Sequence, residues 1–180
     1  MDNTRKTPRA GWIDYDHGLF FITICTKARI HYFGDVMNGE MILSEIGKIV
    51  DKELSHPEIH HPEIYIPLYC VMPNHIHAIV GVDPTQRANS DMGCHIPSGL
   101  RNPNPSQRVN PDVGRHVPTL SKYIASMKSS VSKLAHLIDP DFGWQTRYHD
   151  HIIRGSKDGT IISDYILNNP RNWNKDCFYE

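Results

Sequence analysis

The sequence predicts one α+β domain over residues 1–180, with a ferredoxin-like fold in which a split βαβ pattern forms an antiparallel sheet. Strand-like and helix-like segments follow one another in the order β-α-β-β-α-β-α, and the first six match this pattern. The chain of 180 residues is long enough to bury a core, and its 39% hydrophobic fraction is ordinary for a globular protein. We therefore expect helices on one face of the sheet and a further, C-terminal helix.

The strands are predicted from runs of aromatic and β-branched residues. These runs place strands at residues 18–26, 64–72, 75–82 and 148–154. Because Pro67 cannot donate a backbone hydrogen bond, the second strand should lie at a sheet edge or contain a bulge. The turn at Pro73-Asn74 joins the second and third strands into an antiparallel hairpin.

The helices are predicted from apolar residues that recur every three to four positions. The first helix follows Ser44, whose hydroxyl can cap its N-terminus. The second has Thr119 as its cap and an apolar stripe that continues through Leu134 to Ile138. The third is capped by Ser156 and closed by Pro170.

Residues 83–117 differ in composition from the rest of the chain. They contain five prolines, several Asn, Ser and Gly, and few apolar residues. An insert of this length without periodic apolar residues is usually functional or disordered. We expect a mobile loop that takes no part in the core.

The composition indicates the cellular compartment of the protein and the kind of partner that it could bind. The four cysteines are scattered and form no Cys-x-x-Cys pair, which indicates a reduced, cytoplasmic protein. No apolar run has the length of a membrane span, and the N-terminus lacks the apolar core of a signal peptide. The net charge is −1, but residues 101–157 carry nine Lys and Arg against four Asp and Glu. A polyanion could dock on this segment, although an unevenly charged surface is the simpler explanation.

His75 and His77 are the first candidate functional residues. In a strand their side chains point to the same face, about 7 Å apart along the chain, while Ile76 and Ala78 point to the other. Two imidazoles on one face can share a metal ion. A pair of structural histidines fits the same spacing, so the pair alone decides nothing.

The predicted last helix supplies two further candidates. Tyr165 and Asn169 are four residues apart and therefore lie on one helix face. Asn169 offers an amide oxygen as a third ligand beside two imidazoles, and Tyr165 offers a phenol one turn away. Tyr148 and Tyr123 are rival tyrosines: Tyr148 lies in a predicted strand, whereas Tyr123 belongs to the apolar stripe of the second helix.

Together these residues resemble a known family. Residues 71–77 (VMPNHIH) look like the His-hydrophobe-His motif of the HUH single-strand DNA endonucleases. Residues 144–154 (WQTRYHDHIIR) and 164–170 (DYILNNP) resemble the REP-associated tyrosine transposases, relatives of single-tyrosine insertion-sequence transposases. Residues 21–26 (FITICT) and 31–34 (HYFG) resemble that family too. The resemblance spans nearly all of the chain outside the 83–117 insert.

The resemblance implies a role for each of the four candidates. It makes His75, His77 and Asn169 ligands of a divalent ion, Mg²⁺ or Mn²⁺, and it makes Tyr165 the nucleophile. The implied substrate is hairpin-forming single-stranded DNA, and the implied fold is again ferredoxin-like. Attack by Tyr165 would leave a 5′-phosphotyrosine and a free 3′-hydroxyl, and a 3′-hydroxyl of another strand could reverse the step.

Some features of this interpretation stay open. The phenol needs a proton acceptor, for which His149, His151 and water are candidates. The predicted DNA contacts are Lys122, Lys128, Arg147 and Arg154. A homodimer is one option for the oligomeric state. Two alternatives remain: a catalytically silent module of the same fold that binds single-stranded nucleic acid, and a metal-binding structural protein.

Overall fold

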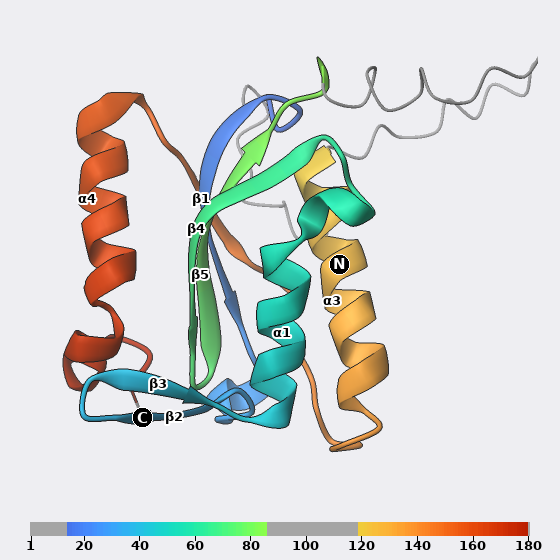
Figure 1. The fold of residues 1–180 in the computed structure, drawn as a ribbon, viewed down its shortest axis with the longest axis vertical. Coiled ribbons are helices and arrows are strands. Elements are labelled where there is room, and N and C mark those ends of the chain that lie inside the picture. The colour runs from blue at the N-terminus through green and yellow to red at the C-terminus, as the bar shows by residue number, and fades with distance from the viewer. Residues whose placement is uncertain (1–13, 86–118, 180) are drawn as a thin grey trace, which may run out of the picture.

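The computed structural model describes residues 14–85 and 119–179. Its central feature is a four-stranded antiparallel sheet in the order β4-β5-β1-β6 (Figure 1). The strands are β1 (Gly18–Cys25), β4 (Ile64–Met72), β5 (His75–Val82) and β6 (His149–Ile152). This is the strand order of the split βαβ pattern, so the predicted ferredoxin-like α+β fold is confirmed.

The helices form two layers on opposite faces of the sheet. Figure 1 shows α1 (Glu45–Ser55) and α3 (Thr119–Ala135) side by side on one face, and α4 (Gly155–Asn168) alone on the other. The short helices η1 (Lys27–Arg29), η2 (Pro57–Ile59) and η4 (Pro170–Lys175) complete the helical elements of the described ranges. In these ranges no helix is both long and apolar enough to span a membrane.

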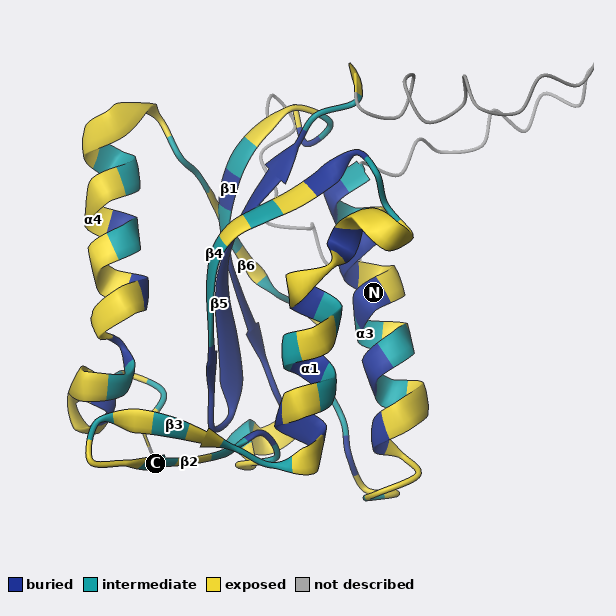
Figure 2. Ribbon diagram, viewed as in Figure 1, coloured by how far each residue is buried: buried dark blue, intermediate teal, exposed yellow. Residues whose placement is uncertain are grey.

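The main core lies between the sheet and the α1–α3 layer. Alternate residues of β1 and β5 point into it, among them Phe20, Ile22, Ile76 and Ala78. A smaller apolar cluster on the other face joins Ile79 of β5 to Ile162 and Ile166 of α4. Every residue of β5 is therefore buried, as Figure 2 shows, and polar side chains on this strand lie out of water.

The predicted edge position and bulge of the second strand are both present. β4 is an edge strand of the sheet, and its pairing with β5 shifts register between Tyr65 and Leu68, around Pro67. The predicted cap of α1 is also present, because the Ser44 hydroxyl accepts a hydrogen bond from the Gly47 N–H at 3.0 Å.

The ends of the other two helices differ from the predictions. Thr119 is the first residue of α3, and its N–H and hydroxyl both donate to the Asp16 carboxylate, at 2.7 and 2.6 Å. The helix ends at Ala135, before Ile138, and both Leu134 and Ile138 are exposed rather than in the core. At the start of α4, Asp158 accepts from the Arg154 N–H at 2.9 Å, so this carboxylate, and not Ser156, satisfies the helix terminus.

A second, two-stranded sheet was not predicted. It is the hairpin of β2 (Gly34–Met37) and β3 (Glu40–Leu43), which lies across one end of the main sheet (Figure 1). Its turn is Asn38-Gly39, with φ angles of 55° and 79°, as a tight two-residue hairpin turn requires. The predicted mobile loop at 83–117 lies outside the described residues, apart from residues 83–85.

Candidate active site

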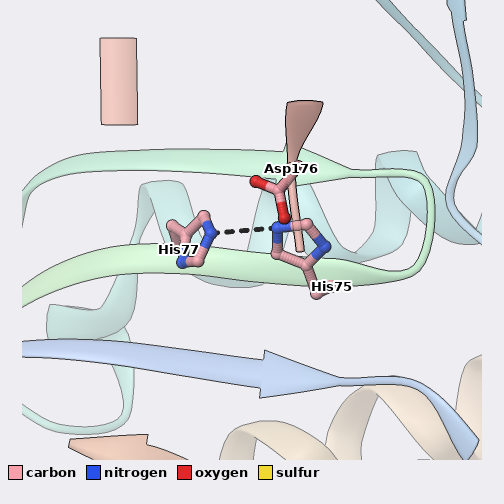
Figure 3. A group of neighbouring side chains, drawn as sticks. All are labelled: His75, His77 and Asp176. Atoms are coloured by element: carbon pink, nitrogen blue, oxygen red, sulfur yellow. Dashed lines mark hydrogen bonds between the residues drawn. The ribbon is translucent and has the colours of Figure 1, made fainter. Parts of the chain in front are cut away.

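The two histidines of β5 lie together on the sheet face that α4 covers. His75 is fully buried and His77 is 1% exposed. Their Nε2 atoms are 3.0 Å apart, so both rings present the same nitrogen to one point (Figure 3). The alternation of side chains along a strand brings them to one face, as predicted from the spacing.

Each imidazole is oriented by a neighbour on its other nitrogen. Asn74 donates its amide to the Phe178 carbonyl at 2.9 Å, which turns its Oδ1 toward His75 Nδ1 at 2.8 Å. An amide oxygen can only accept, so His75 carries its proton on Nδ1 and directs a lone pair from Nε2. Thr23 Oγ1 lies 2.9 Å from His77 Nδ1. Such outer partners fix the ring orientation and tautomer of metal-binding histidines.

Burial keeps both rings neutral at neutral pH. It lowers the pKa of His77 to about 4, because a buried imidazolium loses its hydration. Burial also lowers the pKa of His75, and the neighbouring His77 lowers it further. Neutral imidazole is the form that binds a metal ion, so neither ring has to lose a proton first.

The C-terminal segment places three polar side chains against this pair. Tyr165 of α4 has its hydroxyl 3.1 Å from His77 Nε2 and donates to Asp176 Oδ2 at 3.3 Å. Asn169, one helical turn later and 2% exposed, donates its amide to the same Asp176 oxygen at 2.8 Å. The two predicted helix residues and the two predicted strand residues therefore meet in one cluster.

Asp176 is the residue that the sequence analysis missed. Candidate ligand atoms of His75, His77 and Asp176 all lie within 4.8 Å of one another, with the carboxylate directed at the imidazoles (Figure 3). Burial acts to raise the pKa of Asp176, but hydrogen bonds from the Phe178 N–H and the Asn169 amide outweigh it, and the pKa falls. The carboxyl group is therefore ionised at neutral pH.

The donor set fits a divalent ion. Within the described ranges, Asn169 Oδ1 is buried and has no hydrogen-bond partner. An orphaned buried oxygen is costly, by about 1–3 kcal/mol, unless something unseen coordinates it. Two neutral imidazoles, this amide oxygen and the carboxylate of Asp176 make a mixed nitrogen and oxygen set of the kind that Mn²⁺, Zn²⁺ or Mg²⁺ accepts.

Tyr165 is the tyrosine that borders the cluster. Burial and the nearby Asp176 raise the pKa of its hydroxyl, so the phenol is protonated at neutral pH. The rival tyrosines lie on the α1–α3 side of the sheet. Tyr123 is 2% exposed in the main core, and Tyr148 packs against that core with its hydroxyl 3.2 Å from Ser121 of α3.

A pocket of about 250 Å³ opens next to Tyr165. The β6 residues His149, Asp150 and His151 line it together with Phe21, Thr23, His77, Tyr165 and Phe178. Pairing across the sheet sets Thr23 opposite both His77 and His149, so these side chains form one row on the α4 face. The pocket is therefore continuous with the cluster of His75, His77 and Asp176.

The four cations that were predicted to contact DNA are spread over the molecule. Lys122 and Lys128 lie on α3, behind the sheet as seen from the cluster, and Lys128 donates to the Gln145 carbonyl at 2.6 Å. Arg147 precedes β6 and Arg154 precedes α4, and both are exposed. The structure does not gather these side chains around Tyr165, and their contact with DNA stays a prediction.

Comparison with known proteins found a similar sequence and a solved structure with a similar fold. No family model matches the chain. A solved structure of a REP-associated tyrosine transposase bound to a REP hairpin has a TM-score of 0.57 and 18% identity. The match covers 93% of this chain and 73% of the transposase chain, and it shows that the two share a fold. An uncharacterized protein of Haemophilus influenzae is 31% identical over 177 residues, which are 97% of this chain and 93% of the relative. The chain therefore belongs to the same family as this Haemophilus influenzae protein.

Proposed function

We propose that the protein is a metal-dependent endonuclease and strand transferase that acts on single-stranded, hairpin-forming DNA through Tyr165. One observation carries the proposal: the Tyr165 hydroxyl lies 3.1 Å from the ligand nitrogen of His77, on the helix that also brings Asn169 to the cluster. A phenol beside a set of metal-ligand side chains is an arrangement suited to metal-assisted phosphoryl transfer to a tyrosine.

The ligand set would hold Mg²⁺ or Mn²⁺ through His75 Nε2, His77 Nε2 and Asn169 Oδ1. A divalent ion at this point supplies positive charge next to the scissile phosphate and polarises it. The protein supplies the orientation: Asn74 and Thr23 hold the imidazoles, and Asp176 holds the Asn169 amide. Because these side chains are buried, they need little rearrangement when a phosphate arrives.

Tyr165 then acts as the nucleophile. A bond forms between its oxygen and phosphorus while the bond from phosphorus to the 3′-oxygen breaks, and the leaving oxygen takes up a proton. The products are a 5′-phosphotyrosine and a free 3′-hydroxyl. The phosphodiester energy is retained, so a 3′-hydroxyl of another strand can attack the phosphotyrosine and complete strand transfer.

Asp176 is well placed to accept the phenol proton. Its Oδ2 already accepts the hydrogen bond of the Tyr165 hydroxyl at 3.3 Å. The earlier candidates are less well placed, because His151 pairs with Asp158 at 3.0 Å and His149 has an exposed ring on β6. A proton acceptor is needed because the raised pKa of Tyr165 keeps the phenol protonated.

Hairpin DNA is the proposed substrate class because the transposase that shares this fold is bound to a REP hairpin. The excess of basic residues in 101–157 also suits a polyanionic partner. A homodimer stays one option for the active assembly, and a cytoplasmic location stays an expectation from the scattered cysteines.

Cleavage of labelled DNA tests this function. End-labelled hairpins with randomised single-stranded flanks, and matched full duplexes, are incubated with Mg²⁺, with Mn²⁺ or with EDTA. We expect cutting of the flanked hairpins in Mg²⁺ or Mn²⁺, and no cutting of duplexes or in EDTA. Equal cutting in EDTA would remove the metal from the proposal, and binding without cutting under every condition would favour the silent module.

A further inference from the structure

A second cleft, of about 460 Å³, lies beside the cluster of His75, His77 and Asp176. It separates the β2–β3 hairpin from η4, and Figure 1 shows the hairpin next to the C-terminal end of the chain. The lining side chains that matter here are His31, Asp35, Arg171, Trp173, Asn174 and Tyr179. The proposed mechanism uses none of them.

Aromatic rings connect this cleft to the cluster. The Trp173 ring lies 5.9 Å from the ring of His75, so this side chain borders both sites. On the cleft side it contacts His31 at 5.7 Å and Tyr179 at 5.4 Å between ring centroids. Trp173 is buried, whereas Tyr179 is 53% exposed and is therefore accessible to a ligand.

The charged side chains of the cleft do not neutralise each other. In the parts of the chain that the structure describes, Arg171 forms no ion pair or hydrogen bond through its guanidinium, and Asp35 approaches only His31, at 4.0 Å. The stem of Arg171 packs against the hairpin turn, where a Cβ on Gly39 would lie 3.4 Å from Arg171 Cγ. An anion-binding group and a hydrogen-bond acceptor thus share one cleft and remain available.

We propose that this cleft binds an unpaired nucleotide of the DNA strand, next to the phosphate that Tyr165 attacks. This inference rests on the proposed function of the cluster. A nucleotide matches all three features: its base can stack on Tyr179 and contact the edge of Trp173, and its phosphate can pair with Arg171. The Asp35 carboxylate can accept from the amino group of a base, as acidic side chains do with cytosine. Free phosphate would use only one of the three.

Binding without cleavage isolates this cleft. Fluorescence anisotropy is measured for a labelled dC 10-mer and for an abasic 10-mer with the same phosphates, using a Tyr165→Phe background in EDTA. We expect the dC 10-mer to bind about tenfold more tightly, because base stacking on aromatic side chains is worth that much. Adding Tyr179→Ala should bring this ratio close to one.

The phosphate contact is tested with a matched charge control. Arg171→Ala should weaken binding of both 10-mers more than Lys52→Ala does, since Lys52 is an exposed cation on α1, across the sheet from the cleft. Equal weakening by the two variants, or an unchanged base ratio in Tyr179→Ala, would overturn the proposal. Thermal melts show whether the variants are folded.

Photocrosslinking gives an answer that needs no cleft variant. A 10-mer that contains 5-iododeoxyuridine should crosslink the Tyr165→Phe protein at Trp173 or Tyr179, and crosslinks confined to other residues would contradict the proposal.

The two proposals can fail separately. If the Tyr165→Phe protein binds the two 10-mers equally, but the unmodified protein still forms a covalent DNA adduct, the cleft proposal alone is rejected. A normal base ratio without any adduct rejects strand transfer alone.

Discussion

The Asn169 amide donates to Asp176 at 2.8 Å, and this single bond decides which way the amide faces. With the nitrogen turned to Asp176, the oxygen is turned away and lies buried without a partner in the described part of the chain. The relationship joins a helix residue to a residue that follows η4, so the last helix and the C-terminal segment build the cluster together.

Asp176→Asn should weaken metal binding while leaving the fold intact. The substitution keeps the shape of the side chain but removes the charge and lets the Asn169 amide flip. We expect a loss of 10- to 100-fold in Mn²⁺ affinity, the usual range for a residue that orients a ligand. Isothermal titration with Mn²⁺ measures it. Asp164→Asn, an exposed carboxylate on α4, is the matched control and should bind Mn²⁺ as the unmodified protein does.

Acid should destabilise the metal-free protein between pH 6.5 and pH 4. Because the pKa of His77 is about 4 in the folded state and near 6.5 when unfolded, the unfolded chain binds more protons in this window. The contribution is present above pH 6.5 and is lost as the pH falls, by on the order of 3 kcal/mol in all.

Urea denaturation in EDTA at several pH values measures this loss. His77→Gln should make the decline between pH 6.5 and pH 4 shallower, leaving the part that His75 contributes, whereas His149→Gln, on β6, should not change it. An unchanged pH dependence in His77→Gln would mean that the buried imidazole is not what titrates.

Two glycine-to-alanine substitutions in helices should have opposite effects. A Cβ on Gly47 of α1 would lie 2.1 Å from the Phe33 carbonyl oxygen, so Gly47→Ala must shift the backbone and should destabilise the protein by more than about 1 kcal/mol. Gly159 of α4 has ordinary space, with Ile153 at 3.6 Å. Gly159→Ala should therefore stabilise the protein by about 0.5–1 kcal/mol. Chemical denaturation of the two variants decides it.

Local periodicity predicted which residues share a face, and the family resemblance, rather than any spacing, placed the strand pair and the helix pair in one site. A period of two places His75 and His77 on one face, and a spacing of four places Tyr165 and Asn169 on one face. The hairpin β2–β3 also had a local signal, the Asn38-Gly39 pair, which the sequence analysis did not use.

Contacts made through tertiary structure had no such signal. Asp176 lies eleven positions after Tyr165, beyond a proline and a short helix, so no spacing rule connects the two. The Asp16 carboxylate at the start of α3 is 103 positions away from Thr119. Leu134 and Ile138 continue the apolar stripe in the sequence, but the helix ends at Ala135 and both side chains are exposed.

The last prediction is that Tyr165, and neither rival tyrosine, becomes covalently joined to DNA. Its hydroxyl lies 3.1 Å from His77 Nε2, whereas Tyr148 and Tyr123 pack on the α1–α3 side of the sheet. Tyr165→Phe keeps the ring, with its edge contact to Phe21 at 6.1 Å, and removes only the attacking oxygen. Binding of labelled hairpin DNA should therefore survive, and the adduct should disappear from denaturing gels. Tyr148→Phe should leave the adduct in place. The opposite pattern, with the adduct lost only in Tyr148→Phe, would move the nucleophile across the sheet and separate it from the histidine pair.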